Sequence, residues 1–192
     1  LGEVPTCERL VIVEDSAELQ PMHPHVVAMQ SRPANIEGAG LVTMRDLVRQ
    51  ALRMRPDRIV VGEVRGAEVV ELLAALNTGH EGGCGTVHAN SAADVPARLQ
   101  ALGLMAGLDR AALQSLVAAG LQVLIHLDRG PDGIRRVSGV HTVTGAPEQG
   151  GVIRAPAALV HRRTGLHAGP ALGQLARLIR SRGVSTPRMP SR

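Results

Sequence analysis

The sequence predicts an α/β protein in which a mostly parallel β-sheet is flanked by helices. Short apolar runs rich in Val and Ile are typical of strands that are covered on both faces. Amphipathic segments of helical length separate these runs, and strands joined through helices pair in parallel. The chain has 192 residues, of which 44% are apolar, enough for a core. That core is aliphatic, because Phe, Tyr and Trp are absent.

The first elements are two strands and a capped helix. We expect the strands at "RLVIVED" (Arg9 to Asp15) and "HVVAMQ" (His25 to Gln30). Thr43 can cap the helix that follows, with Asp46 at the third helical position. Pro56 ends this helix, since the residue before a proline is disfavoured in the helical conformation. The apolar stripe of the helix comprises Met44, Leu47, Val48, Ala51 and Leu52.

Strands and helices continue to alternate after Pro56. A strand is expected over Arg58 to Gly62 and a helix over about 67–76. We interpret the segment "GGCGTVHANS" (Gly82 to Ser91) as a strand that is made irregular by its glycines and that ends in polar residues. The next helix begins at Ser91 or Asp94, and Asp94 is favoured because a proline then falls in the first helical turn, where its missing N–H is tolerated.

The last part of the pattern is a helix followed by a hairpin. The helix is expected over Asp109 to about Ala119, and strands are expected at Leu121 to Leu127 and at "IRRVSGVHTV". The turn Pro131-Asp132-Gly133 joins these strands.

Composition changes near residue 145, where glycine, proline and arginine rise and apolar periodicity fades. We therefore divide the chain into an α/β domain, 1–145, and a divergent, partly disordered tail, 146–192. Within the tail we expect one helix near 172–179 and disorder in the final "RGVSTPRMPSR".

The net charge of +4 comes from arginine alone, since the chain has no lysine. A basic pI permits contact with nucleic acid or acidic membranes, but the arginines are spread along the chain, so we expect the charge to carry little functional weight. Two cysteines form no metal or disulfide framework. No apolar run approaches the roughly 18 residues of a membrane-spanning helix.

Polar residues end three of the predicted strands. These residues are Glu14 with Asp15, Glu63 after Gly62, and the segment that contains His88. Ligands of open parallel sheets bind outside the carboxyl ends of the strands. Two carboxylates suit a magnesium–phosphate site, where one holds the metal, usually through water, and the other orients or deprotonates the attacking water. Each acid could instead be solvated or cap a helix.

Three segments that contain these residues resemble motifs of the type II/type IV secretion ATPases. "RPDRIVVGEVRG" resembles their Walker B segment, "LVIVEDSAEL" their Asp box and "NTGHEGGCGTVHANS" their His box. The order and spacing match over roughly residues 9–129. Within this superfamily the chain most resembles the CpaF-like ATPases of tight-adherence (Flp/Tad) pilus assembly.

The resemblance implies a RecA-like P-loop NTPase core that uses ATP and Mg²⁺. It implies that Glu14 acts on the attacking water and that Glu63 lies near Mg²⁺, through water. His88 and His80 match the histidines that sense or steady the γ-phosphate. The arginines that match family arginines near the nucleotide are Arg45, Arg53 and Arg65.

The chain departs from the family at its start. The Gly-Lys-Thr/Ser phosphate loop is missing from a chain without lysine. We therefore expect a C-terminal fragment that lacks the Walker A loop and the family's N-terminal domain. The fragment alone should be inactive and bind ATP poorly, because amides of the missing loop cradle the phosphates.

The resemblance also implies an assembly. The parent would form a homo-hexamer at the cytoplasmic face of the inner membrane, beside a membrane-embedded platform protein, with no direct contact to nucleic acid. Two alternatives stay open: a degenerate, non-catalytic interaction module, and a DNA-transfer ATPase of the same superfamily. The absence of aromatic residues argues against base stacking.

Overall fold

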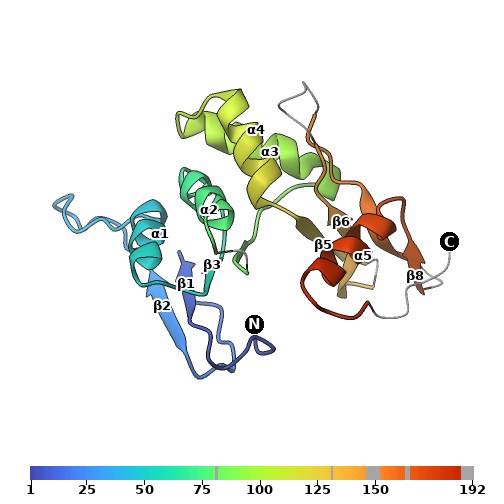
Figure 1. Ribbon diagram of the computed structural model, residues 1–192. Coiled ribbons are helices and arrows are strands. Elements are labelled where there is room, and N and C mark those ends of the chain that lie inside the picture. Colours follow the sequence, from blue (N-terminus) through green and yellow to red (C-terminus); the bar gives the residue numbers. More distant parts are fainter. Residues whose placement is uncertain (81, 131, 146–151, 163–164, 187–192) are drawn as a thin grey trace. The chain divides into compact units, whose positions relative to one another are not determined.

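The computed structural model describes residues 1–192 except 81, 131, 146–151, 163–164 and 187–192 (Figure 1). Its contacts divide the chain into two compact units. The first unit comprises residues 1–88 and 99–116, and the second comprises 89–98 and 117–192.

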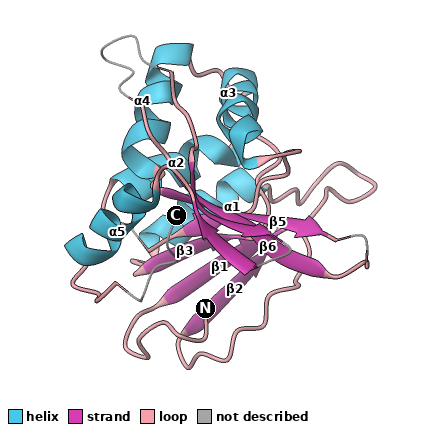
Figure 2. Ribbon diagram, turned by 90° about the vertical axis from the view of Figure 1, so that its right-hand side faces the viewer, coloured by secondary structure: helices cyan, strands magenta, loops and turns pink. Residues whose placement is uncertain are grey.

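The first unit is built on a parallel sheet with the strand order β2-β1-β3-β4. Its central strand β1 (Leu10–Glu14) pairs with β2 (Val26–Gln30) and β3 (Arg58–Val61), which lie on either side of it (Figure 2). Every residue of β1 is buried, as expected of a strand whose apolar side chains are covered on both faces. The predicted α/β fold with a parallel sheet is therefore confirmed.

Two helices of this unit lie between the strands in sequence. The helix α1 (Met44–Arg53) begins with the predicted capping box, in which the Asp46 amide donates to Oγ1 of Thr43 and the Thr43 amide donates to the Asp46 carboxylate. The hydrogen bonds from Thr43 lower the pKa of Asp46. The helix α2 (Glu68–Asn77) follows β3 and packs against α1.

The predicted strand over residues 82–91 is much shorter than expected. Only β4 (Cys84–Gly85) pairs with β3. The surrounding glycines explain this, because they let the segment pass close to its neighbours. A Cβ at Gly83 would lie 2.9 Å from the Ile59 carbonyl oxygen, and one at Gly85 would lie 2.8 Å from the Leu72 side chain.

A 3₁₀ turn (Ala92–Asp94) precedes the helix α3 (Val95–Met105), so Ser91 stands before the turn and Asp94 stands before the helix. The helix α4 (Arg110–Gly120) starts where predicted, with the Ala112 amide donating to Asp109 Oδ1 at 2.8 Å.

The second unit contains an antiparallel sheet in the order β5-β6-β7-β8. The predicted hairpin is present as β5 (Val123–Arg129) and β6 (Arg135–Thr142), although Pro131 of its turn lies outside the described residues. The predicted last helix is α5 (Leu172–Ser181).

The strands β7 (Ala157–Arg162) and β8 (Gly165–Ala168) were not predicted, so the tail holds more regular structure than expected. Ala158 of β7 forms a small core with Ala171 and Leu175. The expected disorder falls partly on 187–192, outside the described residues. The division at residue 145 stays a prediction. Within the described residues, no helix is long and apolar enough to cross a bilayer.

Candidate active site

The acid at the end of β1 is buried and bound to the backbone. Glu14 is 5% exposed, and its Oε1 accepts hydrogen bonds from the amides of Glu18 at 3.2 Å and Leu19 at 3.1 Å. The Gly62 amide donates to the Val13 carbonyl, which places Gly62 beside Glu14 in the sheet. A Cβ at Gly62 would lie 2.7 Å from Cγ of Glu14. Glycine therefore precedes Glu63 because the Glu14 side chain occupies that space.

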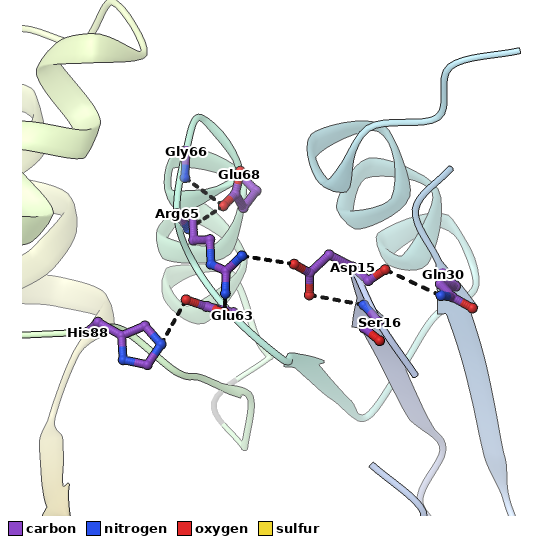
Figure 3. A network of polar contacts seen from close by, with 8 residues as sticks. All are labelled: Asp15, Ser16, Gln30, Glu63, Arg65, Gly66, Glu68 and His88. Atoms are coloured by element: carbon purple, nitrogen blue, oxygen red, sulfur yellow. Dashed lines mark hydrogen bonds and ion pairs between the residues drawn. The ribbon is translucent and has the colours of Figure 1, made fainter. Parts of the chain in front are cut away.

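The acid at the end of β3 has charged partners instead. The side chain of Glu63 is 14% exposed, and its Oε2 forms an ion pair with the Arg65 guanidinium (Figure 3). Its Oε1 lies 2.8 Å from Nε2 of His88, an ion pair when the imidazole is protonated. This Oε1 is buried, and within the described residues no contact to it has hydrogen-bond geometry. The oxygen therefore keeps an unused capacity to accept a hydrogen bond.

Arg65 joins Glu63 to the end of β1. Its side chain is 65% exposed, and Nη1 lies 3.3 Å from Oδ2 of Asp15 (Figure 3). The hydrogen bond from Arg65 to Glu63 raises the pKa of the guanidinium, and the charges of Glu63, Asp15 and Glu18 raise it further. One guanidinium thus bridges the ends of two adjacent strands.

Glu68, the first residue of α2, fixes the turn that carries Arg65. Its Oε1 accepts hydrogen bonds from the amides of Arg65 and Gly66, each at 2.7 Å. The residue is 6% exposed. A buried carboxylate with two amide donors at a helix N-terminus is a strong restraint on backbone direction. Glu68 therefore orients the residue that holds Glu63.

The two histidines of the predicted site differ in their surroundings. His88 is 75% exposed and reaches Glu63. His80 has a buried Nδ1 that makes no hydrogen bond within the described residues. The structure thus brings His88 into the network of Figure 3, whereas His80 is not part of it.

Two of the three predicted arginines have other partners or positions and are not part of that network. Arg45 binds Glu71, with Nε 2.7 Å from Oε1, and Arg49 Nη2 approaches the same oxygen at 2.8 Å. Arg53 is the last residue of α1. The next carbonyl, that of Met54, accepts a hydrogen bond from Arg9, which precedes β1. Arg53 therefore lies at the amino-terminal edge of the sheet, opposite Glu63.

Sequence reasoning missed two residues of the network, Asp15 and Glu68. Asp15 was named only as a neighbour of Glu14. No local pattern indicates its role, because its place beside Glu63 depends on the register in which Val13 of β1 pairs with Val61 of β3. Glu68 could have been found as an acid in the first turn of a predicted helix.

The donor set suits a magnesium ion that is bound together with phosphate. Carboxylate oxygens are the protein ligands that Mg²⁺ prefers, and one or two are usual when phosphates and water complete the shell. The unused acceptor on Glu63 suits a metal-bound water, which donates hydrogen bonds. In the described part of the chain no three His, Cys, Asp or Glu side chains converge on one point, so the protein ligands here are few.

The amino-acid sequence is similar to that of a known protein family and of named relatives. Residues 1–140 match the model of the family described as type II/IV secretion system protein. A Mycobacterium tuberculosis protein with a provisional conjugal-transfer name is 67% identical over 138 residues, which are 72% of this chain and 39% of the relative. The conjugal transfer protein TrbB of Rhizobium radiobacter is 36% identical over 138 residues, 72% of this chain and 40% of TrbB.

A solved structure agrees with the fold. The VirB11 ATPase from the Brucella suis type IV secretion system, crystallised in complex with sulphate, superposes with a TM-score of 0.60 at 30% sequence identity. The superposition covers 71% of this chain and 40% of VirB11. The chain therefore spans about two-fifths of the length of these relatives.

Proposed function

Because the chain belongs to the type II/IV secretion system protein family, we propose that it is part of an ATP-hydrolysing motor subunit of such a system. The observation that carries the proposal is the place of the Glu63 carboxylate, which is 14% exposed at the carboxyl end of β3 and pairs with the side chains of Arg65 and His88. Ligands bind at this edge of an open parallel sheet.

The roles of the residues follow from their positions. Glu63 would hold Mg²⁺ through a water molecule, and the bound ion would neutralise charge on the ATP phosphates. Arg65 and His88 contact the Glu63 carboxylate, so a guanidinium and an imidazole lie next to a phosphate bound there. The motif likeness also proposes His80, Arg45 and Arg53 as nucleotide contacts, although the place of Arg53 at the opposite edge of the sheet does not support a contact with a nucleotide bound at Glu63. The phosphate-loop lysine would come from another part of the protein, since this chain has none.

Glu14 is proposed to act on the attacking water. One of its oxygens accepts two backbone hydrogen bonds, which fixes the orientation of the carboxylate. Orientation of this kind is what a general base needs, because the base must lie within hydrogen-bond reach of the proton that it removes.

Two kinds of secretion machine are candidates for the parent. The motif likeness favours a CpaF-like ATPase of Flp/Tad pilus assembly. The names of the M. tuberculosis and R. radiobacter relatives favour a DNA-transfer system. In either case we propose a homo-hexamer at the cytoplasmic face of the membrane, beside a platform protein. The motor activity itself is common to both candidates.

The test is steady-state ATP hydrolysis by the full-length gene product with Mg²⁺ and after its removal by EDTA. We expect turnover that requires Mg²⁺ and that falls at least about 100-fold in Glu63→Gln. The matched control is Glu8→Gln, which removes an acid paired with Arg58 at 2.6 Å at the start of β3. This control should keep its turnover.

Glu14→Gln tests the second acid. The amide oxygen of glutamine can still accept the two backbone hydrogen bonds, so the loop that follows β1 should stay in place. We expect kcat to fall at least about ten-fold through the loss of a basic oxygen. If the full-length protein does not hydrolyse ATP, or if both variants hydrolyse it like the wild type, the non-catalytic interaction module becomes the better description.

A further inference from the structure

The charges of the chain are divided unevenly along its length. Residues 1–148 contain thirteen arginines and all seventeen acids, a net charge of −4. Residues 149–192 contain eight arginines and no acid, a net charge of +8. The arginines are spread along the chain as expected, but the acids are not, so the net charge is positive only in the last part of the chain. The family match ends at residue 140, so this basic stretch lies beyond it.

The arginines of this stretch face solvent. All those that the structure describes are exposed, namely Arg154, Arg162, Arg177, Arg180 and Arg182. The stretch contains no Asp or Glu side chain. In addition, Arg177 and Arg180 are three residues apart on α5, which places them on neighbouring positions of one helical face. We call the five residues the basic surface.

Exposed aliphatic side chains accompany the basic surface. Val152, Leu166 and Val184 are 61%, 50% and 57% exposed. Each lies within four residues of an arginine of the basic surface along the chain. Surfaces that combine arginines with exposed aliphatic residues are typical of proteins that bind in the headgroup region of a bilayer, where cations meet lipid phosphates and aliphatic groups enter the acyl boundary.

We propose that the basic surface binds the surface of a bilayer that contains anionic phospholipid. A polybasic surface of four to eight arginines is sufficient for such binding. Single-stranded nucleic acid is the other polyanion to consider, but its binding sites use aromatic side chains for base stacking, and this chain has none. The biological meaning rests on the proposed membrane-side motor, whereas the binding itself requires no nucleotide chemistry.

The experiment is sedimentation of the full-length protein with vesicles of phosphatidylcholine and phosphatidylglycerol, compared with vesicles of phosphatidylcholine alone, at low and at physiological salt. We expect binding only to the anionic vesicles, and weaker binding at higher salt, because the ions screen the attraction. The variant Arg162→Gln/Arg177→Gln/Arg180→Gln should lose about 100-fold in vesicle affinity. All three side chains are exposed, so the fold should be kept.

The matched control removes three exposed arginines elsewhere, in Arg55→Gln/Arg98→Gln/Arg110→Gln. Its net charge equals that of the first variant, and we expect less than about a two-fold change in vesicle affinity. Equal losses in both triple variants would overturn the proposal, because net charge alone would then explain the binding. Tighter binding of a single-stranded DNA oligonucleotide through the same three arginines, measured by fluorescence anisotropy at equal salt, would also overturn the proposal.

A failure of the proposed motor function is distinguishable from a failure of this inference. ATP hydrolysis without vesicle binding would reject the basic surface and leave the motor in place. Vesicle binding by a protein that hydrolyses no ATP would reject the motor function and leave the basic surface in place. Both readouts come from one preparation of the full-length protein.

Discussion

The ends of β1 and β3 look alike in sequence but differ in the structure. Each strand is a run of buried aliphatic residues that leads to a glutamate. Glu14 is 5% exposed, its Oε1 accepts two backbone hydrogen bonds and its side chain packs against Gly62. Glu63 instead contacts two exposed side chains, with Oε2 paired to the Arg65 guanidinium and Oε1 2.8 Å from Nε2 of His88.

This difference shows how one pattern supports two roles. The oxygen of Glu14 is held by amides of the loop that follows it, so the residue contributes to the fold and has a fixed orientation. The partners of Glu63 are side chains on exposed turns, and these can be replaced by a metal-bound water or a phosphate at little cost to the fold. Substitutions that disturb the packing of Glu14 should therefore act mainly through stability, whereas substitutions of Glu63 and its partners should act mainly through turnover.

The largest effect on stability is expected at the contact between the two ends. In Gly62→Ala the new Cβ would lie 2.7 Å from Cγ of a buried glutamate. Overpacking of this kind should lower the free energy of unfolding by about 2 kcal/mol, measured by urea denaturation of the full-length protein.

A glycine with free space provides the control for that prediction. Gly173 lies in α5, and the nearest atom to an added Cβ is a guanidinium nitrogen of Arg177 at 3.9 Å. Gly173→Ala should therefore be neutral or stabilise the helix slightly. If Gly62→Ala were as stable as Gly173→Ala, the packing of Glu14 against β3 would not be tight, and the contrast between the two ends would fail.

An intermediate effect is expected from Glu68. In Glu68→Ala the half-buried amides of Arg65 and Gly66 lose their acceptor, which should cost about 2 kcal/mol or less of unfolding free energy. Glu68→Gln keeps an acceptor oxygen and should recover most of that stability. A KM for ATP that rises in Glu68→Ala and returns in Glu68→Gln would show that the turn positions Arg65. Equal unfolding free energies for Ala and Gln would contradict the role of Glu68.

The smallest effect on stability is expected from Arg65. Its side chain is 65% exposed, so water and salt screen its ion pairs with Glu63 and Asp15. Arg65→Gln should leave the urea midpoint unchanged while turnover falls, because a cation next to the phosphate site is lost. A midpoint that drops as far as in Gly62→Ala would make Arg65 a structural residue.

Much of this arrangement could be predicted from the sequence. The strands β1 and β3, the Thr43–Asp46 capping box and the two acids at the strand ends follow from local patterns. The strands β7 and β8 do not, because neither is a continuous apolar run and both are half-buried. The pairing of Asp15 with Arg65 spans fifty residues and depends on the register between β1 and β3, which periodicity alone does not give.

The measurement that tests the central claim most directly compares Glu63→Gln with Glu14→Gln in the full-length protein, with kcat, ATP affinity and unfolding free energy determined for each. For Glu63→Gln we expect at least about a 100-fold loss of kcat, with ATP affinity and unfolding free energy retained. An unchanged kcat in Glu63→Gln, or a loss of kcat that is matched by a loss of stability, would show that Glu63 supports the fold and not the chemistry.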